Sequence, residues 1–368
     1  MKILSDRSQL QESFSLVAGI APQKTPKPIL QNILLEAGDN GLTMFATDYE
    51  ISAKVMVESV KVQKPGKVLL PARETSALLR ELNEPTLTLE SKEFRCTIES
   101  SGGSFVLVGD DPEQFPAEMQ VGKGQKINLP AKEFLSMVRK TIFAAAREES
   151  RYMINGVLFD CHDDCLRLVA TDGRRLALNY YNLVGGKKKP VTIKSVVPVR
   201  ALQLLTRAIS DESAEDLEII FTENQVGFRF ANISLTSQLL ECNFPDYDVV
   251  IPKIAETSCE INRDLLERNV RKVAILSSGD LRVIRMNFGS QSLEMSAESS
   301  GVGRADQVMD VDVKGPGGIL SFNPDYLLEA LKVTDPEVVR LDMSDDSTPA
   351  KMTLGESFTY ILMPISGS

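Results

Sequence analysis

Short runs of alternating apolar and polar residues recur along the chain, and two helical patterns interrupt them in each third. In the first third, Leu10, Phe14 and Val17 are spaced four and three residues apart, which places them on one face of a helix. Ser5 is the expected N-cap of this helix, which we expect to end near Ile20, before a proline-rich loop. The other elements predicted here are a helix over residues 73–82 and the strands MKIL, ILLEA, LTMFATD, EISAKVMVES, KVLLP, LTLES, FRCTIES and SFVLVG.

The other two thirds repeat this alternation of elements. The middle third predicts helices over residues 131–149 and 199–209, and the last third predicts helices over residues 263–276 and 324–333. Strand patterns fill the remainder, and a turn is expected at Gly185 and Gly186 with a basic tip at residues 187–189. Each third thus contains roughly eight short strands and two helices, which is typical of a β-rich α+β domain.

The three thirds also share sequence. LTMFATD at residues 42–48 returns as LRLVATD at 166–172, and a fainter LEMSAES stands at 293–299, so the copies are 124 and 127 residues apart. Pro71, Pro198 and Asn323 mark a second phrase at similar spacing. A period of this length indicates tandem domains and not a solenoid, whose repeats are 20–50 residues long. We therefore predict three like domains, at residues 1–122, 123–253 and 254–368.

Composition supports a globular, three-domain chain. The 368 residues are 43% hydrophobic and 25% charged, and domains commonly contain about 100–150 residues. Met1 begins a strand-like run with no charged and apolar leader, and no apolar run approaches the ~20 residues of a membrane span. We expect a cytoplasmic protein without membrane contact. Five scattered cysteines suit a reducing compartment.

The run CHDDC at residues 161–165 contains the only histidine and is the strongest candidate for a metal site. Its spacing matches no structural zinc pattern, and no second cluster completes four ligands. Asp163 and Asp164 are better explained as the tip of a hairpin between two apolar strands. We therefore expect neither a metal nor another cofactor.

Motifs of catalysis are missing from the sequence. It contains no GxxxxGK[ST], HExxH or GxSxG, and the glycine-rich stretches at 101–104 and 315–318 lie between predicted strands, where hairpin turns explain them. Asp48 and Asp172 recur in the repeat, but a carboxylate at the same point of successive domains more often caps a turn than transfers protons. The sequence favours a binding scaffold over an enzyme.

Charge is distributed unevenly. The net charge is −10, yet residues 131–151 carry five cations against three carboxylates, and residues 262–272 carry four against two. A mildly basic set of helices on an acidic body would attract duplex DNA without reading its bases. A charged helix face can equally be only a solvated surface, so both interpretations stay open on charge alone.

Several phrases together carry a family resemblance. LLPAR with its following helix, RYMINGVLF, LVATDGRRLA, FPDY and the terminal YILMPI stand in the order found in the bacterial sliding clamps, the beta subunits of DNA polymerase III, which the chain resembles over its full length. The resemblance implies three clamp domains per chain and a head-to-tail homodimer, whose ring of six domains encircles double-stranded DNA independently of sequence. It also implies a non-catalytic processivity factor that tethers DNA polymerase catalytic subunits, the clamp loader and other proteins with clamp-binding motifs.

The resemblance further implies a pocket for short partner peptides, lined by apolar side chains that would accept Leu or Phe anchors. The family often has His at position 174, a basic residue at 249 and an Arg-Leu end, where this chain has Arg174, Val249 and Ser366–Ser368. We expect the peptide preference to differ accordingly. The corresponding positions here are Ile154, Thr171, Gly173, Arg174, Arg175, Leu176, Pro245, Val249, Val250, Ile361, Met363, Pro364 and Ile365.

Two more sets of residues follow from the helix charges and the resemblance. The dimer seam is expected to join Phe105 and Leu107 of one chain to Ile275 and Leu276 of the other. The acidic run that the family often has in its third domain is thin here. The residues expected to face DNA are Lys24, Arg73, Arg80, Arg139, Lys140, Arg147, Arg200, Arg207, Arg268 and Lys272.

Two other classes of function remain as alternatives. One is a magnesium-dependent nucleic-acid enzyme using Asp48, Asp110, Asp111 and Asp172, which a nuclease assay would reveal. The other is a protein-interaction scaffold that does not bind DNA, which retention on nicked circular DNA would exclude.

Overall fold

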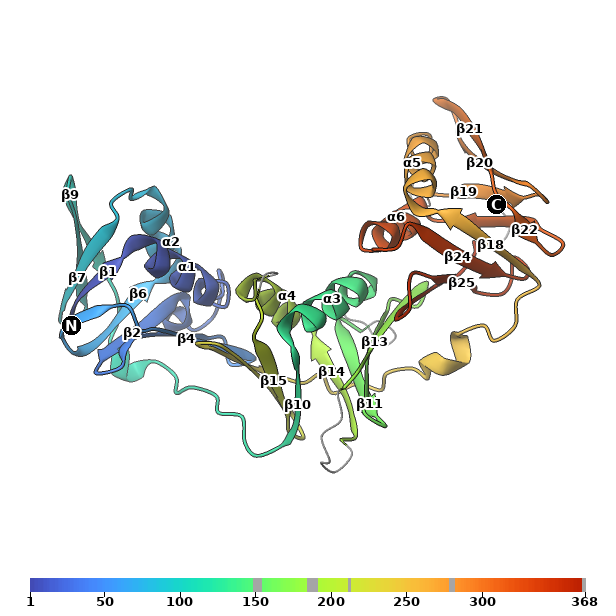
Figure 1. Cartoon of the computed structure of the whole chain (residues 1–368). Coiled ribbons are helices and arrows are strands. Elements are labelled where there is room, and N and C mark those ends of the chain that lie inside the picture. Colours follow the sequence, from blue (N-terminus) through green and yellow to red (C-terminus); the bar gives the residue numbers. More distant parts are fainter. Residues whose placement is uncertain (148–153, 184–190, 211–212, 278–281, 366–368) are drawn as a thin grey trace. The chain divides into compact units, whose positions relative to one another are not determined.

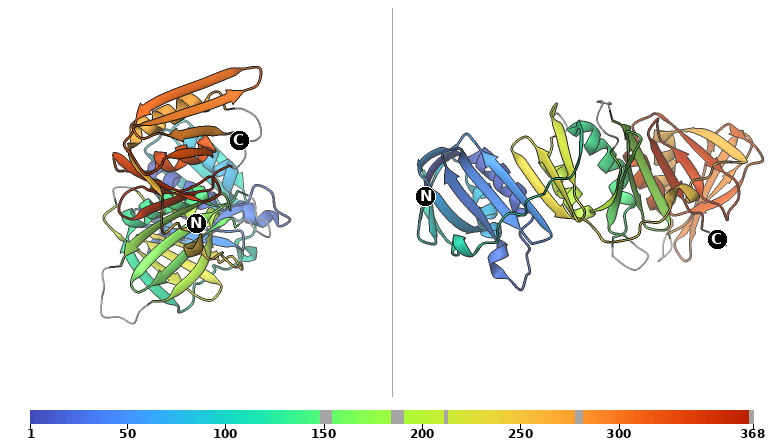
Figure 2. Two further views of the ribbon diagram at one scale, coloured as in Figure 1. Left: turned by 90° about the vertical axis from the view of Figure 1, so that its right-hand side faces the viewer. Right: turned by 90° about the horizontal axis from the view of Figure 1, so that it is seen from below.

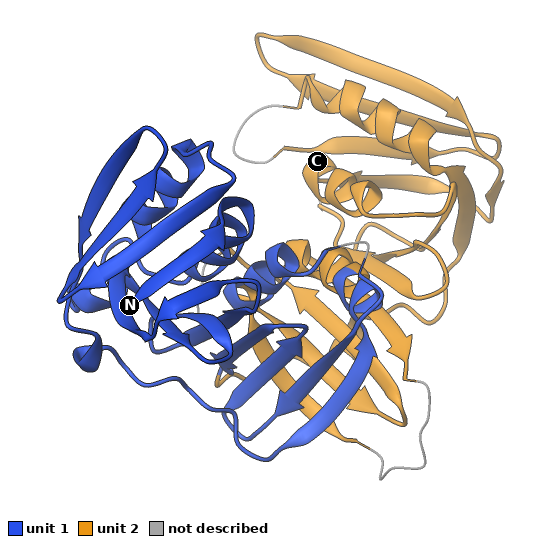
Figure 3. Cartoon of the chain, turned by 60° about the vertical axis from the view of Figure 1, so that its left-hand side comes forward, with its two compact units in different colours: residues 1–135, 200–240 blue, residues 136–199, 241–368 orange. Residues whose placement is uncertain are grey.

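The computed structural model describes residues 1–147, 154–183, 191–210, 213–277 and 282–365. The basic tip expected at 187–189 lies outside these residues. The chain forms two compact units, one of Met1–Leu135 with Arg200–Leu240 and one of Ser136–Val199 with Glu241–Ser368 (Figures 1 and 3).

Unit 1 contains a five-stranded sheet, ordered β5-β1-β7-β8-β9, and an eight-stranded sheet, ordered β10-β15-β16-β17-β4-β3-β2-β6. The five strands are β1 (Lys2–Asp6), β5 (Lys61–Lys64), β7 (Thr86–Lys92), β8 (Arg95–Ser100) and β9 (Gly103–Val108). The eight are β2 (Asn32–Gly38), β3 (Gly41–Thr47), β4 (Ile51–Val57), β6 (Gly66–Pro71), β10 (Gln125–Pro130), β15 (Asp216–Phe221), β16 (Gln225–Phe230) and β17 (Ile233–Gln238).

Unit 2 contains a nine-stranded sheet, ordered β14-β11-β12-β13-β26-β25-β24-β18-β22, and a four-stranded sheet, ordered β21-β20-β19-β23. The nine strands are β11 (Gly156–His162), β12 (Cys165–Thr171), β13 (Arg175–Asn182), β14 (Ile193–Pro198), β18 (Thr257–Asn262), β22 (Val313–Lys314), β24 (Val338–Met343), β25 (Ala350–Thr353) and β26 (Phe358–Leu362). The four are β19 (Ile284–Phe288), β20 (Ser292–Ser299), β21 (Gly303–Asp310) and β23 (Gly318–Phe322). The long β20–β21 ribbon stands out in Figure 2.

Six α-helices occur in the described residues: α1 (Arg7–Ala18), α2 (Ala72–Glu81), α3 (Ala131–Thr141), α4 (Val199–Ala208), α5 (Arg263–Ala274) and α6 (Pro324–Lys332). In unit 1, α1 contacts α2 and strands β3 and β4, and it buries Leu10, Phe14 and Val17 as their spacing predicts. In unit 2, α5 contacts α6, β20 and β21. The helices therefore pack against one another and against a sheet within each unit.

The contact units do not coincide with the three sequence repeats, because the middle repeat contributes strands to both. Its β17 pairs with β4 of the first repeat, with Leu235 opposite Ala53. Its β13 pairs with β26 of the last repeat, with Leu176 opposite Ile361. Both junctions are thus hydrogen-bonded sheets, and the cut between units falls inside the middle repeat.

Two predicted helix boundaries were wrong. Ser5 is not the N-cap of α1, because it still pairs with Leu87 in β7, and the cap is Asp6, whose side chain accepts from the Gln9 N–H at 3.1 Å. The helix expected over 131–149 ends at Thr141, whose hydroxyl donates back to the Met137 carbonyl at 2.8 Å. A short 3₁₀ turn, Ile142–Ala144, follows.

Two hairpin predictions are confirmed. Asp163 and Asp164 form the tip between β11 and β12, with φ angles of 53° and 58°. The glycine-rich stretch at 101–104 turns between the paired strands β8 and β9. These two tips perform the turn chemistry that their sequence indicates. The hairpin expected at 315–318 was wrong, because β22 belongs to the nine-stranded sheet and β23 to the four-stranded sheet, so this stretch connects two sheets.

Candidate functional site

The turn between β12 and β13 is built by side chains that cap its backbone. The Asp172 Oδ1 accepts from the N–H groups of Arg174 and Arg175 at 3.0 and 3.1 Å, and the Thr171 hydroxyl donates to the Arg175 carbonyl at 2.7 Å. Gly173 has a φ of +82°, a left-handed conformation that glycine adopts without a steric penalty. The prediction that Asp172 caps a turn is confirmed.

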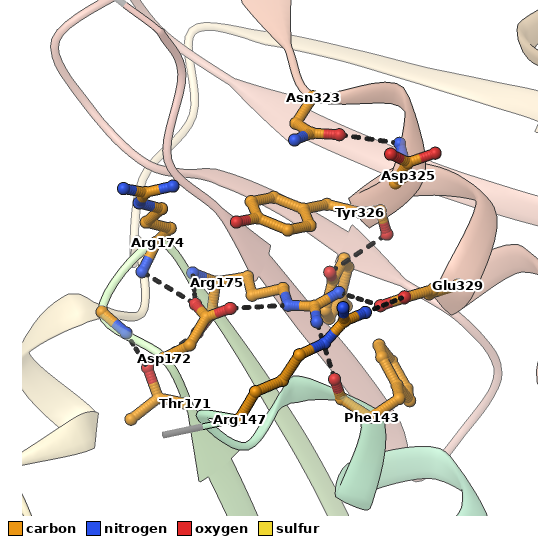
Figure 4. A network of polar contacts seen from close by, with 12 residues as sticks. Phe143, Arg147, Thr171, Asp172, Arg174, Arg175, Asn323, Asp325, Tyr326 and Glu329 are labelled. Atoms are coloured by element: carbon orange, nitrogen blue, oxygen red, sulfur yellow. Dashed lines mark hydrogen bonds and ion pairs between the residues drawn. The ribbon is translucent and has the colours of Figure 1, made fainter. Parts of the chain in front are cut away.

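Arg175 is the centre of a polar network that joins this turn to helix α6 (Figure 4). Its side chain is only 4% exposed. All three guanidinium nitrogens have partners: Nε donates to Asp172 Oδ2 at 3.0 Å, Nη2 donates to the Phe143 carbonyl at 2.7 Å, and Nη1 pairs with Glu329. The ring of Tyr326 lies 4.3 Å from the guanidinium carbon. A buried cation needs such complete pairing, since an unpaired buried charge is very costly.

The electrostatics of this network keep the arginine charged. Burial alone would lower the pKa of Arg175, but the Tyr360 hydroxyl and the Glu329 carboxylate outweigh it and raise that pKa above its ordinary value. Burial has the opposite effect on Tyr360, whose pKa it raises because the tyrosine is charged only when deprotonated. The Tyr360 hydroxyl donates to the Tyr326 carbonyl at 3.1 Å. The Arg175 guanidinium therefore stays charged and links the turn to Glu329 on α6. It does not act in proton transfer.

The C-terminal strand β26 completes this part of the site. It pairs with β13, and directly after it the Met363 N–H donates to the Arg174 carbonyl at 2.9 Å and the Ile365 N–H to the Ser321 carbonyl at 2.8 Å. Met363 is 41% exposed, whereas Ile361 is buried. The segment thus emerges from the sheet beside the turn and presents one flexible apolar side chain to solvent.

A second part of the site is the segment that precedes β18. It forms a 3₁₀ turn, Tyr247–Val250, capped by Asp246, whose side chain accepts from the Asp248 N–H. Val249 and Val250 are 77% and 41% exposed, while Tyr247 is only 3% exposed. Large apolar side chains exposed side by side in this way commonly mark an interaction surface.

The thirteen predicted pocket residues therefore divide by exposure. Ten are exposed or half-buried: Ile154, Thr171, Gly173, Arg174, Pro245, Val249, Val250, Met363, Pro364 and Ile365. Arg175, Leu176 and Ile361 are buried. The prediction missed Glu329, Tyr326 and Tyr247, although Tyr247 stands within the FPDY phrase that was singled out.

The cations predicted to face DNA differ in how they are held. Lys140 pairs with Asp335 at 2.8 Å, and Arg147 lies 3.8 Å from Glu329. Arg200 pairs with Asp48 and donates to the Ile20 carbonyl. Arg147 and Arg200 are nevertheless exposed, at 90% and 44% of their side chains. The other seven are also exposed residues: Lys24, Arg73, Arg80, Arg139, Arg207, Arg268 and Lys272.

The four predicted seam residues lie at two sheet edges. Phe105 on β9 is 39% exposed, with Leu107 half-buried on the same strand. Ile275, just after α5, is 76% exposed, and the half-buried Leu276 lies beside Gly303 at the start of β21. Both β9 and β21 are edge strands of their sheets.

The fold and site define the chain as a scaffold of three clamp-like domains. Family models for the N-terminal, central and C-terminal domains of the DNA polymerase III beta subunit match residues 1–120, 128–246 and 248–366. The chain belongs to the DNA polymerase III beta subunit family. Its role is that of a processivity clamp in DNA replication, and it is not an enzyme.

Individual relatives agree with this assignment. Beta sliding clamps of Chlamydia pneumoniae and Staphylococcus epidermidis are 28% and 30% identical, over 99% and 97% of this chain and 99% and 96% of theirs. The crystal structure of the sliding clamp from Bacillus subtilis aligns over 100% of both chains with a TM-score of 0.93 at 26% identity. A Pseudomonas aeruginosa sliding clamp bound to griselimycin aligns over 99% of both chains with a TM-score of 0.93 at 25% identity. Among the described residues, no helix is long and apolar enough to cross a membrane.

Proposed function

We propose that two copies of this chain pair head to tail into a closed ring around double-stranded DNA, and that each copy tethers partner proteins through an apolar peptide pocket. The proposed domains are residues 1–122, 123–253 and 254–368. The partners are DNA polymerase catalytic subunits, the clamp loader and other proteins with clamp-binding peptides, in the cytoplasm.

The pairing of edge strands supports the ring most directly. The last strand of the second repeat, β17, pairs with β4 of the first, and the last strand of the third repeat, β26, pairs with β13 of the second. The counterparts of these strands are β9 and β21, which have one sheet neighbour each among the described residues. Pairing β9 of one copy with β21 of the other would repeat the same junction and cover both open edges.

Apolar side chains at these edges suit such a seam. Phe105, Val106 and Val108 are exposed along β9, and Ile275 is exposed beside β21. Two of the three charged residues of β21 pair with each other, since the Arg304 Nη2 lies 2.7 Å from Asp306 Oδ1. The seam should therefore depend more on apolar contact and strand pairing than on ion pairs.

A ring holds DNA by topology more than by affinity. The net charge of −10 repels DNA at long range, and few exposed cations oppose it, so direct binding should be weak and fall steeply with salt. Protein loaded on a nicked circle should nonetheless remain at salt that abolishes phosphate contacts, and should leave soon after the circle is cut. Equal lifetimes on circular and cut DNA would refute the ring.

The cations can be tested separately from the ring. Reversing the charges of Arg139, Lys140, Arg268 and Lys272 should slow the first encounter with DNA more than it shortens retention on a closed circle, because retention depends on closure. A variant that loads normally but dissociates from intact circles would show that these cations, and not ring closure, retain the protein on DNA.

The proposed peptide pocket rests on exposed apolar side chains of two segments, Met363 after β26 and Val249 and Val250 before β18. The test is Met363→Ala, alone and with Leu176→Ala, measured by the fluorescence anisotropy of a labelled short peptide with Leu and Phe anchors. Loss of the Met363 side chain should weaken binding about 10- to 30-fold if that side chain is buried by the peptide. Val338→Ala, at a half-exposed position of β24, is the control. Unchanged peptide affinity in the folded Met363→Ala protein would refute this site.

Griselimycin offers a second probe, because a clamp of this fold has been solved with it. If it competes with the peptide on this chain, the two ligands share the pocket. Competition that Met363→Ala removes would assign both to this segment.

A further inference from the structure

The segment that carries Val249 and Val250 is held at one buried point. Tyr247, two residues before Val249, is 3% exposed, whereas Asp246, Asp248, Val249 and Val250 around it are exposed. A tyrosine buried in an otherwise exposed segment anchors that segment, because its ring provides most of the apolar area that the segment removes from water.

The anchor is also polar. The Tyr247 hydroxyl donates to Asp160 Oδ2 on β11 at 2.7 Å, and the other carboxylate oxygen lies 3.1 Å from His162 Nδ1. The Arg167 Nη1 on β12 lies 2.9 Å from His162 Nε2 and so closes the cluster. A hydrogen bond to a carboxylate is stronger than one between neutral groups, and this one joins residues 87 positions apart in the chain.

The ionisation of Tyr247 agrees with this geometry. Burial, together with the hydrogen bond to Asp160, raises the pKa of Tyr247 to about 12. The phenol therefore remains a neutral donor throughout the physiological range, and the bond to Asp160 persists there.

We propose that Tyr247 and Asp160 are positioning residues for peptide recognition: their bond holds the turn Tyr247–Val250 against β11 so that Val249 and Val250 are already in place when a peptide arrives. This inference rests on the proposed peptide pocket. Tyr247 itself is buried and so acts through the two valines.

The physical reason is preorganisation. A segment that must be ordered during binding subtracts the entropy of ordering from the affinity, and a segment already fixed does not. Losing one intramolecular hydrogen bond costs a modest amount of free energy. A turn that has lost this bond should therefore bind the peptide about three- to tenfold more weakly. The loss should appear mainly in a faster dissociation rate.

The decisive variant is Tyr247→Phe, which retains the ring and removes only the hydroxyl. Its control is Tyr180→Phe, which removes a hydroxyl that donates to the Glu356 carbonyl at 3.1 Å and not to a residue of the turn. Tyr180 lies opposite Arg167 in the β12–β13 pairing, so this variant also tests the loss of a hydroxyl near the cluster. Affinity and dissociation rate are measured with the same labelled peptide, and backbone amide exchange is followed over residues 245–250. We expect weaker binding and faster exchange in Tyr247→Phe, and neither change in Tyr180→Phe.

Variants of the acceptor separate positioning from general stability. Asp160→Asn keeps an oxygen for the Tyr247 hydroxyl and should retain most of the affinity, whereas Asp160→Ala should match Tyr247→Phe. The double variant Tyr247→Phe with Asp160→Ala should be no weaker than Asp160→Ala alone, because Asp160→Ala already removes the bond to Tyr247 together with the contact to His162.

Each result decides the question. Normal peptide affinity in Tyr247→Phe, together with lost affinity in Met363→Ala, would overturn the positioning role and leave the pocket standing. Weakened binding without faster exchange at 245–250, or equal weakening in Tyr180→Phe, would also overturn it. Normal affinity in Met363→Ala would instead refute the pocket itself.

Discussion

Two turns of the molecule, one in each unit, begin with the same three residues, Ala-Thr-Asp, at 46–48 and 170–172. Their backbones are capped alike, but their aspartates bind different arginines. In unit 1 the Asp48 Oδ1 accepts from the N–H groups of Glu50 and Ile51 at 3.0 and 2.7 Å. In unit 2 the Asp172 Oδ1 accepts from the corresponding N–H groups of Arg174 and Arg175 at 3.0 and 3.1 Å. The residue directly after the aspartate is left-handed in both turns, at Tyr49 with φ 75° and Gly173 with φ 82°.

The turns differ in what their second carboxylate oxygen binds. Asp48 pairs with Arg200, a distant residue whose side chain is 44% exposed. Asp172 pairs with Arg175 of its own turn, which is 4% exposed and continues to Glu329 on α6. The capped turn is therefore shared by the first two repeats, whereas the buried network around Arg175 lies in unit 2.

The linkers that follow the repeats differ in the same way. Counting from Phe115 and Phe244, the first linker has Glu118 where the second has Tyr247. Glu118 forms a partly exposed ion pair with Lys54 at 2.9 Å, and Tyr247 forms a buried bond with Asp160 at 2.7 Å. Partly exposed ion pairs contribute little and weaken in salt, so the second linker should be held more rigidly.

The largest expected effect is at the edges that the chain leaves open. Ile275→Asp should give folded monomers, because an unpaired carboxylate buried in an apolar seam costs several kcal/mol. Val338→Asp, at an exposed position of β24, should remain dimeric. Light scattering at low micromolar concentration measures both, and dimers of Ile275→Asp would place the seam elsewhere.

A smaller effect is expected from the two arginines. Arg175→Ala should lower the free energy of unfolding by about 2–4 kcal/mol, because it leaves Glu329 and Asp172 without their buried partner. Arg200→Ala should cost less, about 1 kcal/mol, because the Arg200 side chain is 44% exposed although its partner Asp48 is 9% exposed. Urea denaturation gives both values. Equal losses would show that burial does not distinguish the two networks.

High pH should act through Tyr247. Its pKa is about 12 in the folded chain and about 10 when exposed, so the folded state binds more protons between these values. The stability that the neutral phenol provides is complete below pH 10 and is lost as the pH rises toward 12. Unfolding free energies across this window should therefore fall less in Tyr247→Phe than in the wild type. Parallel curves would mean that other groups dominate.

The smallest effect is expected at the left-handed positions of the two turns. Gly173→Ala should cost about 1 kcal/mol, since the space is open but φ is positive. Tyr49→Gly should relieve similar strain while losing the contact of the Lys27 ammonium with the ring at 4.5 Å, so its net effect should be near zero. Thermal unfolding of the two variants checks this difference, with a lower Tm expected for Gly173→Ala and an unchanged Tm for Tyr49→Gly.

Much of the architecture could be predicted, because the signals involved are local. The helix at Leu10, Phe14 and Val17, the hairpin tip at Asp163 and the caps at Asp48 and Asp172 depend on residues within a few positions of one another. The early end of α3 could not be predicted in this way. Phe143 lies just after the end of α3, and its ring contacts the Tyr360 ring and the Arg175 guanidinium. Both partners belong to strands that are distant in the sequence.

The sequence by itself determined the repeat, the type of each domain and the family, since these depend on periodicity and on phrases that can be compared directly. Only the tertiary structure decided that Arg175 is buried while Arg174 is exposed, because Arg174 still belongs to the turn, whereas Arg175 begins β13, whose residues Arg175–Asn179 are all covered. It alone also joined Tyr247 to Asp160 and Arg175 to Glu329, 87 and 154 positions apart in the chain. Such pairs depend on strand register and on the packing of whole elements, which neither partner's neighbourhood in the sequence encodes.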